Sequence, residues 1–225
     1  MKKAFLILIS LTGLLYCCNS NLEDPEVDED GELIAEDEFT KGEIDLQDTL
    51  RLVEGTIPEN WIKMQLLDNG YYVGFPKEPT RKERKSSRRV DYKLKRSKYR
   101  LSCNLTDLSE EPSFQENKSY RSDYYKAIVE DLAEGIDGVV EIQNSFYSQG
   151  IYEGVRATIV AEDVRIYLQC IVIEPILYTM SLTLFDDEKP VYLQLRDKFF
   201  YSFGNELYRS KIERDSSDKK VNLGN

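Results

Sequence analysis

The residue types that perform most enzyme chemistry are unevenly represented in this chain of 225 residues. The sequence contains no histidine, which is the usual general base near neutral pH and the commonest transition-metal ligand. Ser–His–Asp and Cys–His nucleophiles are therefore excluded, whereas a Ser–Lys pair or paired carboxylates remain open. No glycine-rich phosphate loop precedes a predicted helix. We therefore expect a protein that is not an enzyme and that binds no cofactor and no metal.

Two of the four cysteines, Cys17 and Cys18, stand where an N-terminal apolar segment ends. Residues 4–15 carry no charge, but they are too few for a membrane-spanning helix, which needs about 20 residues. A segment of this length is typical of a signal peptide. It resembles a bacterial lipoprotein signal, in which the residue after the cleavage site is a cysteine that receives lipid.

That resemblance implies a signal peptide over residues 1–17 and lipidation of Cys18, because Cys17 is a small residue before the cut. Lipidation of Cys17 is the alternative, although Tyr16 fits the preceding position poorly. An ordinary secretory signal with incidental cysteines also remains open. The lipoprotein interpretation places the chain in the bacterial cell envelope, anchored to the inner or outer membrane through N-terminal acyl chains.

Acidic residues are concentrated directly after the predicted lipidation site. Residues 19–48 contain thirteen acidic side chains and one basic side chain, and few apolar ones. Such a segment buries too little apolar surface to offset its chain entropy, and its charges repel one another. We therefore interpret residues 18–48 as a disordered tether rather than an acidic recognition tail. Residues 49–208 then form one domain, followed by a polar tail over residues 209–225.

The other two cysteines, Cys103 and Cys170, lie in apolar stretches with the alternation of strands. Export to an oxidising compartment permits a disulfide between them. A disulfide that closes a loop of about 67 residues would stabilise the fold by about 4 kcal/mol in the chain-entropy model. The sequence leaves a disulfide and two buried free thiols as equal alternatives, and it favours both over a reactive thiol.

Basic residues are densest between residues 81 and 100. This segment contains eleven Lys and Arg residues and only two acidic residues, Glu83 and Asp91. Tyr92 and Tyr99 are interleaved with them, as in some nucleic-acid-binding surfaces. The alternation, however, places both tyrosines on the leucine-bearing face, opposite most cations. A base-stacking platform needs aromatic rings and cations on one surface. We therefore predict no nucleic-acid partner.

The basic segment is better suited to an anionic glycan, lipid headgroup or envelope protein. Near an anionic membrane each cation contributes about 1 kcal/mol of binding. The alternatives are a solvated hairpin and pairing with the acidic tether. The candidate contacts are Arg84, Lys85, Arg88, Arg89, Lys93 and Lys95. The acidic clusters at residues 162–163 and 186–188 are interpreted as turn and helix-cap residues rather than calcium ligands.

The elements that position these residues follow from hydrophobic periodicity. Alternating apolar residues predict strand pairs within residues 60–76, 90–108, 139–162 and 164–185, with turns at Asn69-Gly70 and Gln149-Gly150. Helical spacing predicts helices over residues 119–135 and 186–203, and Gly135 is expected to close the first. Residues 79–89 are expected to form a basic loop. The sequence therefore predicts an α+β fold with a mostly antiparallel sheet flanked by helices.

The order of these motifs resembles the PsbP-like fold family over roughly residues 60–204. The matching pieces are Gly70–Pro79, Tyr99–Leu108, Ser119–Gly135, Gly150–Gly154, Val164–Leu184 and Phe199–Phe203. The resemblance implies an α/β/α sandwich and places the chain beside the DcrB-like bacterial envelope lipoproteins. Other members are photosystem accessory proteins and a small-GTPase-binding protein. Because these roles are unrelated and share no catalytic motif, the family implies a fold and not a reaction.

The function predicted from the sequence is that of a membrane-anchored envelope lipoprotein with a non-catalytic binding or assembly domain. The alternative is an envelope hydrolase that uses carboxylates or a Ser–Lys pair, which would need a deep pocket with converging side chains. A third class, an antitoxin-like or phage-related envelope factor, would need evidence from neighbouring genes.

Overall fold

The computed structural model describes residues 53–110, 118–185 and 187–207. The predicted signal peptide, the tether, the tail over residues 209–225, Cys17 and Cys18 lie outside the described residues. Within the described ranges, no helix is long and apolar enough to cross a membrane.

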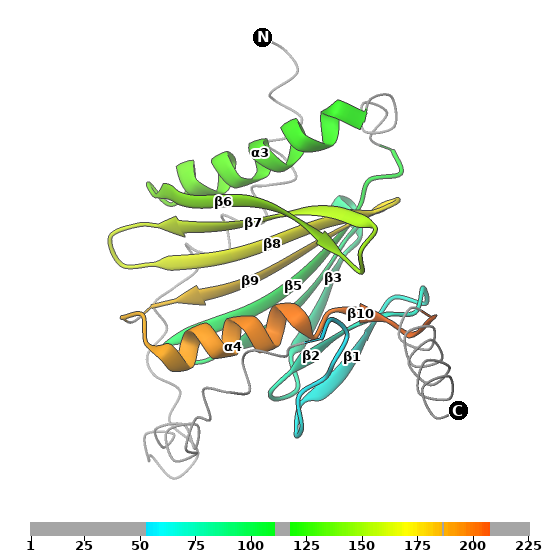
Figure 1. Cartoon of the computed structure of the whole chain (residues 1–225), viewed down its shortest axis with the longest axis horizontal. Helices are drawn as coiled ribbons and strands as arrows, with labels where there is room; N and C mark the ends of the chain where they lie inside the picture. The colour runs from blue at the N-terminus through cyan, green and yellow to red at the C-terminus, as the bar shows by residue number, and fades with distance from the viewer. Residues whose placement is uncertain (1–52, 111–117, 186, 208–225) are drawn as a thin grey trace, which may run out of the picture.

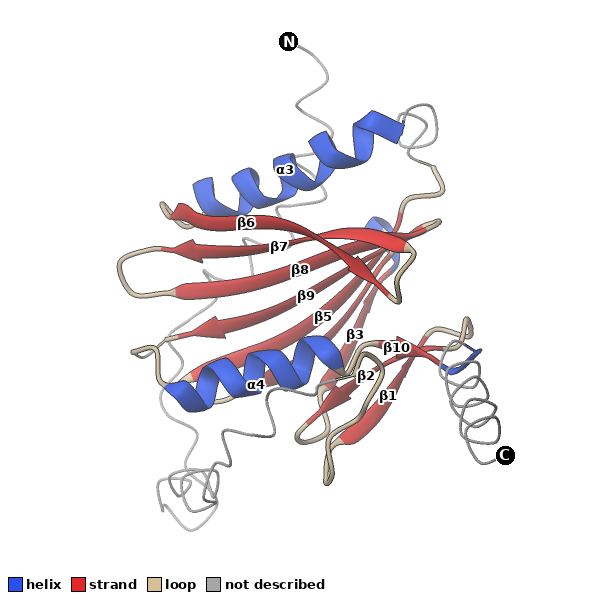
Figure 2. Cartoon of the chain, viewed as in Figure 1, coloured by secondary structure: helices blue, strands red, loops and turns tan. Residues whose placement is uncertain are grey.

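A large antiparallel sheet forms the centre of the fold (Figures 1 and 2). Its seven described strands are arranged in the order β3-β4-β5-β9-β8-β7-β6. The bounds are β3 (Thr80–Arg84), β4 (Arg89–Lys95), β5 (Tyr99–Asp107), β6 (Val139–Ser148), β7 (Tyr152–Val160), β8 (Arg165–Ile173) and β9 (Ile176–Leu184). Hairpins join most neighbours, and the pairing of β5 with β9 joins the two halves of the sheet.

A second, three-stranded sheet consists of β1 (Ile62–Leu66), β2 (Tyr71–Phe75) and β10 (Gly204–Asn205). Its hairpin turns at the predicted Asn69-Gly70, where Gly70 has a φ of 79°. The short β10 returns from the C-terminal end of the domain to pair with β2, so residues far apart in the sequence close this sheet.

Helices lie on opposite faces of the large sheet, as Figure 1 shows. Helix α3 (Lys118–Glu134) covers β6 and β7, and helix α4 (Pro190–Tyr201) lies over the other face, beside the small sheet. A short 3-10 helix, η3 (Lys85–Ser87), joins β3 to β4. This arrangement confirms the predicted α+β class with a mostly antiparallel sheet between helices.

Each face of the large sheet has its own hydrophobic core. On the face that carries α3 (the α3 face), Ile128, Val129 and Leu132 of the helix pack on β7 and β8. On the other face (the α4 face), Phe199 and Phe203 pack with residues of β5, β9 and the small sheet. Because successive residues of a strand point to opposite faces, β8 and β9 contribute to both cores.

The predicted elements are confirmed, but some of their bounds differ: the helix expected over residues 186–203 spans only Pro190–Tyr201. The turn between β6 and β7 is confirmed at Gln149 and Gly150, whose φ angles are 52° and 69°; with Ile151 they form a three-residue loop between the paired Ser148 and Tyr152. Gly135 does not supply the left-handed residue after α3, because Asp137 does, with a φ of 50°. The expected basic loop over residues 79–89 is instead strand β3 followed by η3.

Candidate functional site

The basic segment forms the outer edge of the large sheet. Among the described strands, β3 pairs only with β4, so its other side forms an edge of the described sheet. The register places Arg84 opposite Arg89 and Lys82 opposite Asp91, and side chains at paired positions share a face. These residues therefore point to the α3 face, whereas Val90, Tyr92 and Leu94 point into the core on the α4 face.

Two predicted contact residues are held by a buried carboxylate. Asp91 is 1% exposed and Arg89 is 4% exposed. Nε of Arg84 donates to Oδ2 of Asp91 at 3.0 Å, and Nε of Arg89 donates to Oδ1 of the same carboxylate. A buried charge is tolerated only when it is paired and hydrogen-bonded. Arg84 and Arg89 therefore anchor the hairpin, and Arg89 is not an exposed contact as the sequence had suggested.

The connection between β3 and β4 presents two further predicted residues. Lys85 is exposed in η3, and Arg88 ends η3 in the left-handed region, with a φ of 47°. Arg88 donates to Oγ of Ser109 at 3.4 Å and forms an ion pair with Glu110. A surface cavity of about 220 Å³ opens here. Its lining residues are Leu67, Glu83, Arg84, Lys85, Arg88, Arg89, Val90, Leu105, Asp107 and Ile176.

The remaining two predicted residues lie further along β4. Lys95 is exposed, and Lys93 is half-buried on the α3 face. Lys93 pairs with Ser102 of β5, which in turn pairs with Ser181 of β9. Lys95 pairs in the same way with Arg100, and Arg100 with Thr183. The structure therefore brings cations from β4 beside small polar residues from β5 and β9.

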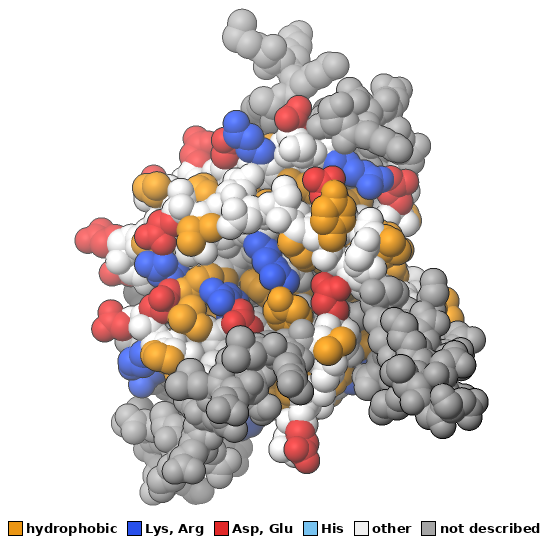
Figure 3. Space-filling model, viewed as in Figure 1, with side chains coloured by type: hydrophobic (Ala, Val, Ile, Leu, Met, Phe, Trp, Pro, Cys, Tyr) orange, Lys and Arg blue, Asp and Glu red, His pale blue; other side chains and the backbone are white. Residues whose placement is uncertain are grey.

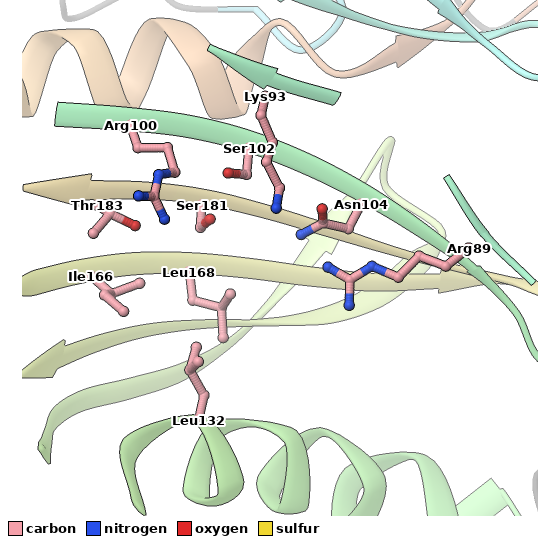
Figure 4. Close-up of a pocket in the computed structure, with 10 residues that line it drawn as sticks. All are labelled: Arg89, Lys93, Arg100, Ser102, Asn104, Leu132, Ile166, Leu168, Ser181 and Thr183. Carbon is pink, nitrogen blue, oxygen red and sulfur yellow. The ribbon is translucent and has the colours of Figure 1, made fainter. Parts of the chain in front are cut away.

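The small polar residues on the β4, β5 and β9 part of the α3 face are buried. A solvated hairpin was one alternative for this segment, yet Asp91, Ser102 and Asn104 are all at most 5% exposed. β5 is an inner strand, paired on both sides. The longer side chains of Arg89, Lys93 and Arg100 extend over its small polar residues, as Figure 4 shows.

These residues line a small cavity of about 30 Å³, which we call the polar pocket (Figure 4). Its lining residues are Arg89, Lys93, Arg100, Ser102, Asn104, Leu132, Ile166, Leu168, Ser181 and Thr183. The lining contains three cations and no carboxylate. Leu132 of α3 and Leu168 of β8 form its apolar side, so the pocket lies where the polar part of the face meets the hydrophobic core under α3.

The uncharged members of this pocket were not predicted from the sequence. The sequence does show an alternation of polar residues in both strands. On β5 every second residue is polar at Arg100, Ser102 and Asn104, and on β9 the same holds at Ser181 and Thr183. What the sequence did not reveal is that β5 and β9 are neighbours. Without that pairing the two polar stripes belong to separate hairpins.

The two strand cysteines are free and buried. Cys103 belongs to the core of the α4 face and Cys170 to the core under α3. Burial raises the pKa of both thiols, that of Cys170 to about 12. The free-thiol alternative is therefore the one that the structure shows. Inert buried thiols of this kind are structural rather than reactive.

A cluster of tyrosines joins the two sheets on the α4 face. The hydroxyl groups of Tyr71 and Tyr152 lie 3.2 Å apart, and Nδ2 of Asn69 donates to the hydroxyl of Tyr178 at 2.6 Å. The rings of Tyr71 and Tyr178 have centroids 5.4 Å apart. Burial is the main cause that raises the pKa of Tyr178 to about 12. The cluster therefore acts as a hydrogen-bonded part of the core.

The first acidic cluster lies in the connection between β7 and β8, as expected, whereas the second precedes α4, whose N-cap is Lys189 rather than an acidic residue. Glu162, Asp163, Asp187 and Glu188 are exposed, and Glu188 pairs with Arg165 at 3.5 Å. No group of three or more metal-ligating side chains occurs within residues 53–110, 118–185 and 187–207. On the face shown in Figure 3, positive, negative and hydrophobic side chains are interspersed rather than gathered into one patch.

Comparisons with known proteins give similarities of fold only. No protein-family model matches the chain, and no curated protein matches it either. Cyanobacterial PsbP (CyanoP) from Synechocystis is 14% identical, with a TM-score of 0.46 over 64% of this chain and 92% of that one. The Ran-binding protein Mog1p from Saccharomyces cerevisiae is 13% identical, with a TM-score of 0.43 over 65% and 95% of the two chains.

A third solved structure is the protein of unknown function PA94 from Pseudomonas aeruginosa, a putative regulator. It is 15% identical, with a TM-score of 0.34 over 61% of this chain and 88% of that one. PsbP is thus among the structural neighbours, as the resemblance in the sequence had suggested. At these levels of similarity, nothing about activity or partners follows for this chain, and membership of the DcrB-like branch stays a prediction.

Proposed function

We propose that this chain is a lipid-anchored protein of the bacterial cell envelope whose domain is a non-catalytic binding module for an anionic membrane surface. The observation that carries the proposal is the basic edge of the large sheet. The exposed basic side chains of β3, β4 and their connections are Arg81, Lys82, Lys85, Lys95 and Lys98, with Glu83 the exposed acidic residue among them. We call these five residues the basic edge.

The hairpin presents this charge on a rigid support. Asp91 fixes Arg84 and Arg89 from within, and the apolar side of β4 is buried in the core. The strand already fixes the backbone of these residues, so only their side chains lose conformational freedom on binding. Cations along an open edge also discourage pairing with a second sheet, which leaves the edge available to a non-protein surface.

The predicted tether supports the same proposal. A domain attached to a membrane by a flexible segment meets that membrane at a high effective concentration. Each lysine near an anionic leaflet contributes about 1 kcal/mol, and the attraction falls off within the Debye length. A few weak contacts would therefore be enough to orient the domain on the surface.

The Ser–Lys hydrolase has one observation in its favour, because the register places Lys93 directly opposite Ser102. A serine nucleophile must reach its substrate, however. Ser102 is 5% exposed, and the pocket around it has a volume of only about 30 Å³, which leaves no room for an acyl group with its leaving group. The geometry therefore favours binding over catalysis.

Vesicle co-sedimentation tests the proposal with the chain that carries C17S and C18S, so that acyl chains play no part. The variants are the triple substitution K82Q/K85Q/K95Q on the basic edge and a charge-matched control, K126Q/K189Q/K198Q, whose lysines lie on α3 and at or on α4, away from the basic edge. We expect binding to vesicles with phosphatidylglycerol but not to pure phosphatidylcholine. The edge triple should bind about a hundredfold more weakly, at ~1 kcal/mol per lysine.

The control triple should bind like the parent chain, and added salt should weaken the binding of both. Binding that resists salt, or that falls equally in the two triples, would remove the basic edge from consideration.

A further inference from the structure

The polar pocket has the composition of an anion site, although it lies on the buried face of the sheet and not on the basic edge. Arg89, Lys93 and Arg100 extend toward its centre from different directions, as Figure 4 shows. Ser102 lies at the middle of the group: Lys93 and Ser181 flank it on the neighbouring strands, and Arg100 and Asn104 precede and follow it on the same face of β5.

Two buried polar atoms of the pocket have no hydrogen-bond partner within the part of the chain that the structure describes. They are Nη2 of Arg89 and Oδ1 of Asn104. Arg89 is 4% exposed and Asn104 is 3% exposed. A buried donor on a charged group that makes no hydrogen bond is costly, and a bound ion is one of the arrangements that would satisfy it.

The local charge is positive even though a carboxylate is close. Asp91 lies on the same face, opposite Asn104, but it is already bound by Arg84 and Arg89. Four positive charges lie around this single negative charge, so the net charge is +3. They belong to Arg84, Arg89, Lys93 and Arg100. Arg89 donates its hydrogen bond to Asp91 through Nε. Its Nη2 therefore remains as a donor that lines the pocket.

We propose that the polar pocket binds one phosphate group that carries a proton, either as free phosphate or as the monoester headgroup of a lipid. Guanidinium and ammonium donors suit the charged oxygens of phosphate. Oδ1 of Asn104 is an acceptor and suits the single P–OH group of monohydrogen phosphate or a phosphate monoester. The hydroxyl groups of Ser102, Ser181 and Thr183 supply further donors around the anion.

The volume of the pocket is consistent with an ion of this size. One water needs about 10–15 Å³ of the same kind of space, and the pocket has about 30 Å³. This space suits one tetrahedral oxyanion and excludes a sugar. The inference goes beyond the proposed membrane contact, because it concerns buried groups and a single ion rather than exposed lysines and a surface.

Equilibrium dialysis of the full chain against radiolabelled orthophosphate, at constant ionic strength, tests the inference. The pocket variants are Lys93→Gln, which removes a cation, and Ser102→Val, which blocks the centre without changing charge. The control variant is Lys126→Gln on α3. We expect saturable binding of one phosphate, weakened at least about tenfold in both pocket variants and unchanged in the control. Thermal melts establish that the variants are folded.

Three outcomes would overturn the inference: no saturable binding to the parent chain, equal binding to folded pocket variants, or equal affinity for sulfate, which has no P–OH equivalent at neutral pH. Vesicles then distinguish the two sources. If Lys93→Gln weakens binding to phosphatidic acid but not to phosphatidylglycerol, the ligand is a lipid headgroup. If it weakens only orthophosphate binding, the ligand is soluble phosphate. K82Q/K85Q/K95Q should retain phosphate binding, which separates this test from that of the basic edge.

Discussion

Cys103 and Cys170 lie on opposite faces of the large sheet, although both of their strands are neighbours of β9. Cys103 of β5 pairs with Met180, and Cys170 of β8 pairs with Thr179. Met180 and Thr179 are consecutive residues, and consecutive residues of a strand point in opposite directions. One thiol therefore lies in each core, with the sheet between them, and a disulfide would require the sheet to come apart.

The first prediction concerns the reactivity of these thiols. In the chain that carries C17S and C18S, Cys103 and Cys170 are the remaining cysteines. Both are 0% exposed, so a thiol reagent at pH 8 should label neither in the folded protein and both in 6 M urea. Fast labelling without denaturant, or a pair of thiols that appears only after reduction, would contradict the structure.

The second prediction concerns alkaline pH. Burial raises the pKa of the Cys170 thiol from 9.0 to about 12 and that of the Tyr125 hydroxyl from 10.0 to about 12. Above pH 9 the unfolded chain therefore releases protons that the folded chain retains, and the free energy of unfolding falls as pH rises. This contribution is complete below pH 9 and is lost progressively up to about pH 12.

Urea midpoints measured at pH 8, 9, 10 and 11 should therefore fall steadily over the upper part of this range. Cys170→Ala removes one of the titrating groups and should flatten the fall between pH 9 and 10. A parent midpoint that is the same at pH 8 and pH 10.5 would show that these groups are not buried as described.

The third prediction separates a buried ion pair from an exposed one on neighbouring strands. Asp91→Asn leaves the buried guanidinium of Arg89 without its counter-charge and should lower the free energy of unfolding by about 3–5 kcal/mol. Glu83→Gln removes the partner of Arg81, and both of these residues are exposed. Its effect should stay within about 1 kcal/mol. Urea unfolding of the two variants makes the comparison, and similar midpoints would mean that Asp91 does not hold the hairpin.

The contrast between β3 and β4 shows what the sequence could predict. β4 and β5 were predictable because Val90, Tyr92 and Leu94 alternate with polar residues, and such a pattern specifies a strand by itself. β3 has charged residues on both faces and no apolar alternation, so it is a strand only because it pairs with β4. Tertiary pairing of this kind leaves no local signal in the sequence.

The candidate site was predictable to a similar degree. The alternation of residues along the strands correctly predicted that the tyrosines of the basic hairpin lie on the core face and that most of its cations lie on the opposite face. It did not indicate that Asp91 is buried between Arg84 and Arg89, or that Ser102 meets Ser181. Both facts depend on which strands are neighbours, and β5 and β9 are separated by about 70 residues of sequence.

The fourth prediction concerns the small sheet, which closes through a tight approach of two glycines. A Cβ on Gly204 would lie 2.5 Å from Cα of Gly55 and 2.8 Å from the hydroxyl oxygen of Tyr72. Gly204→Ala should therefore destabilise the sheet by about 1–3 kcal/mol, as overpacking usually does. Trp61, the single tryptophan, precedes β1 and reports on this sheet.

Unfolding followed by the fluorescence of Trp61 should have a lower midpoint in Gly204→Ala than in the parent chain. Gly150→Asn serves as the control, because no atom lies within 4 Å of a Cβ at that position and asparagine tolerates the positive φ. If both variants unfold like the parent, the approach of Gly55 to Gly204 is looser than described.

The last prediction decides between the two N-terminal cysteines. If Cys18 carries the lipid, Cys18→Ser should abolish incorporation of radiolabelled palmitate and release the protein from the membrane fraction, whereas Cys17→Ser should change neither. The reverse pattern would assign the lipid to Cys17. Stable attachment requires more than one acyl chain, so removal of the acylated cysteine should release most of the protein rather than a minor share. Protein that stays membrane-bound and unlabelled in the C17S/C18S variant would show that the anchor is not a lipid on either thiol.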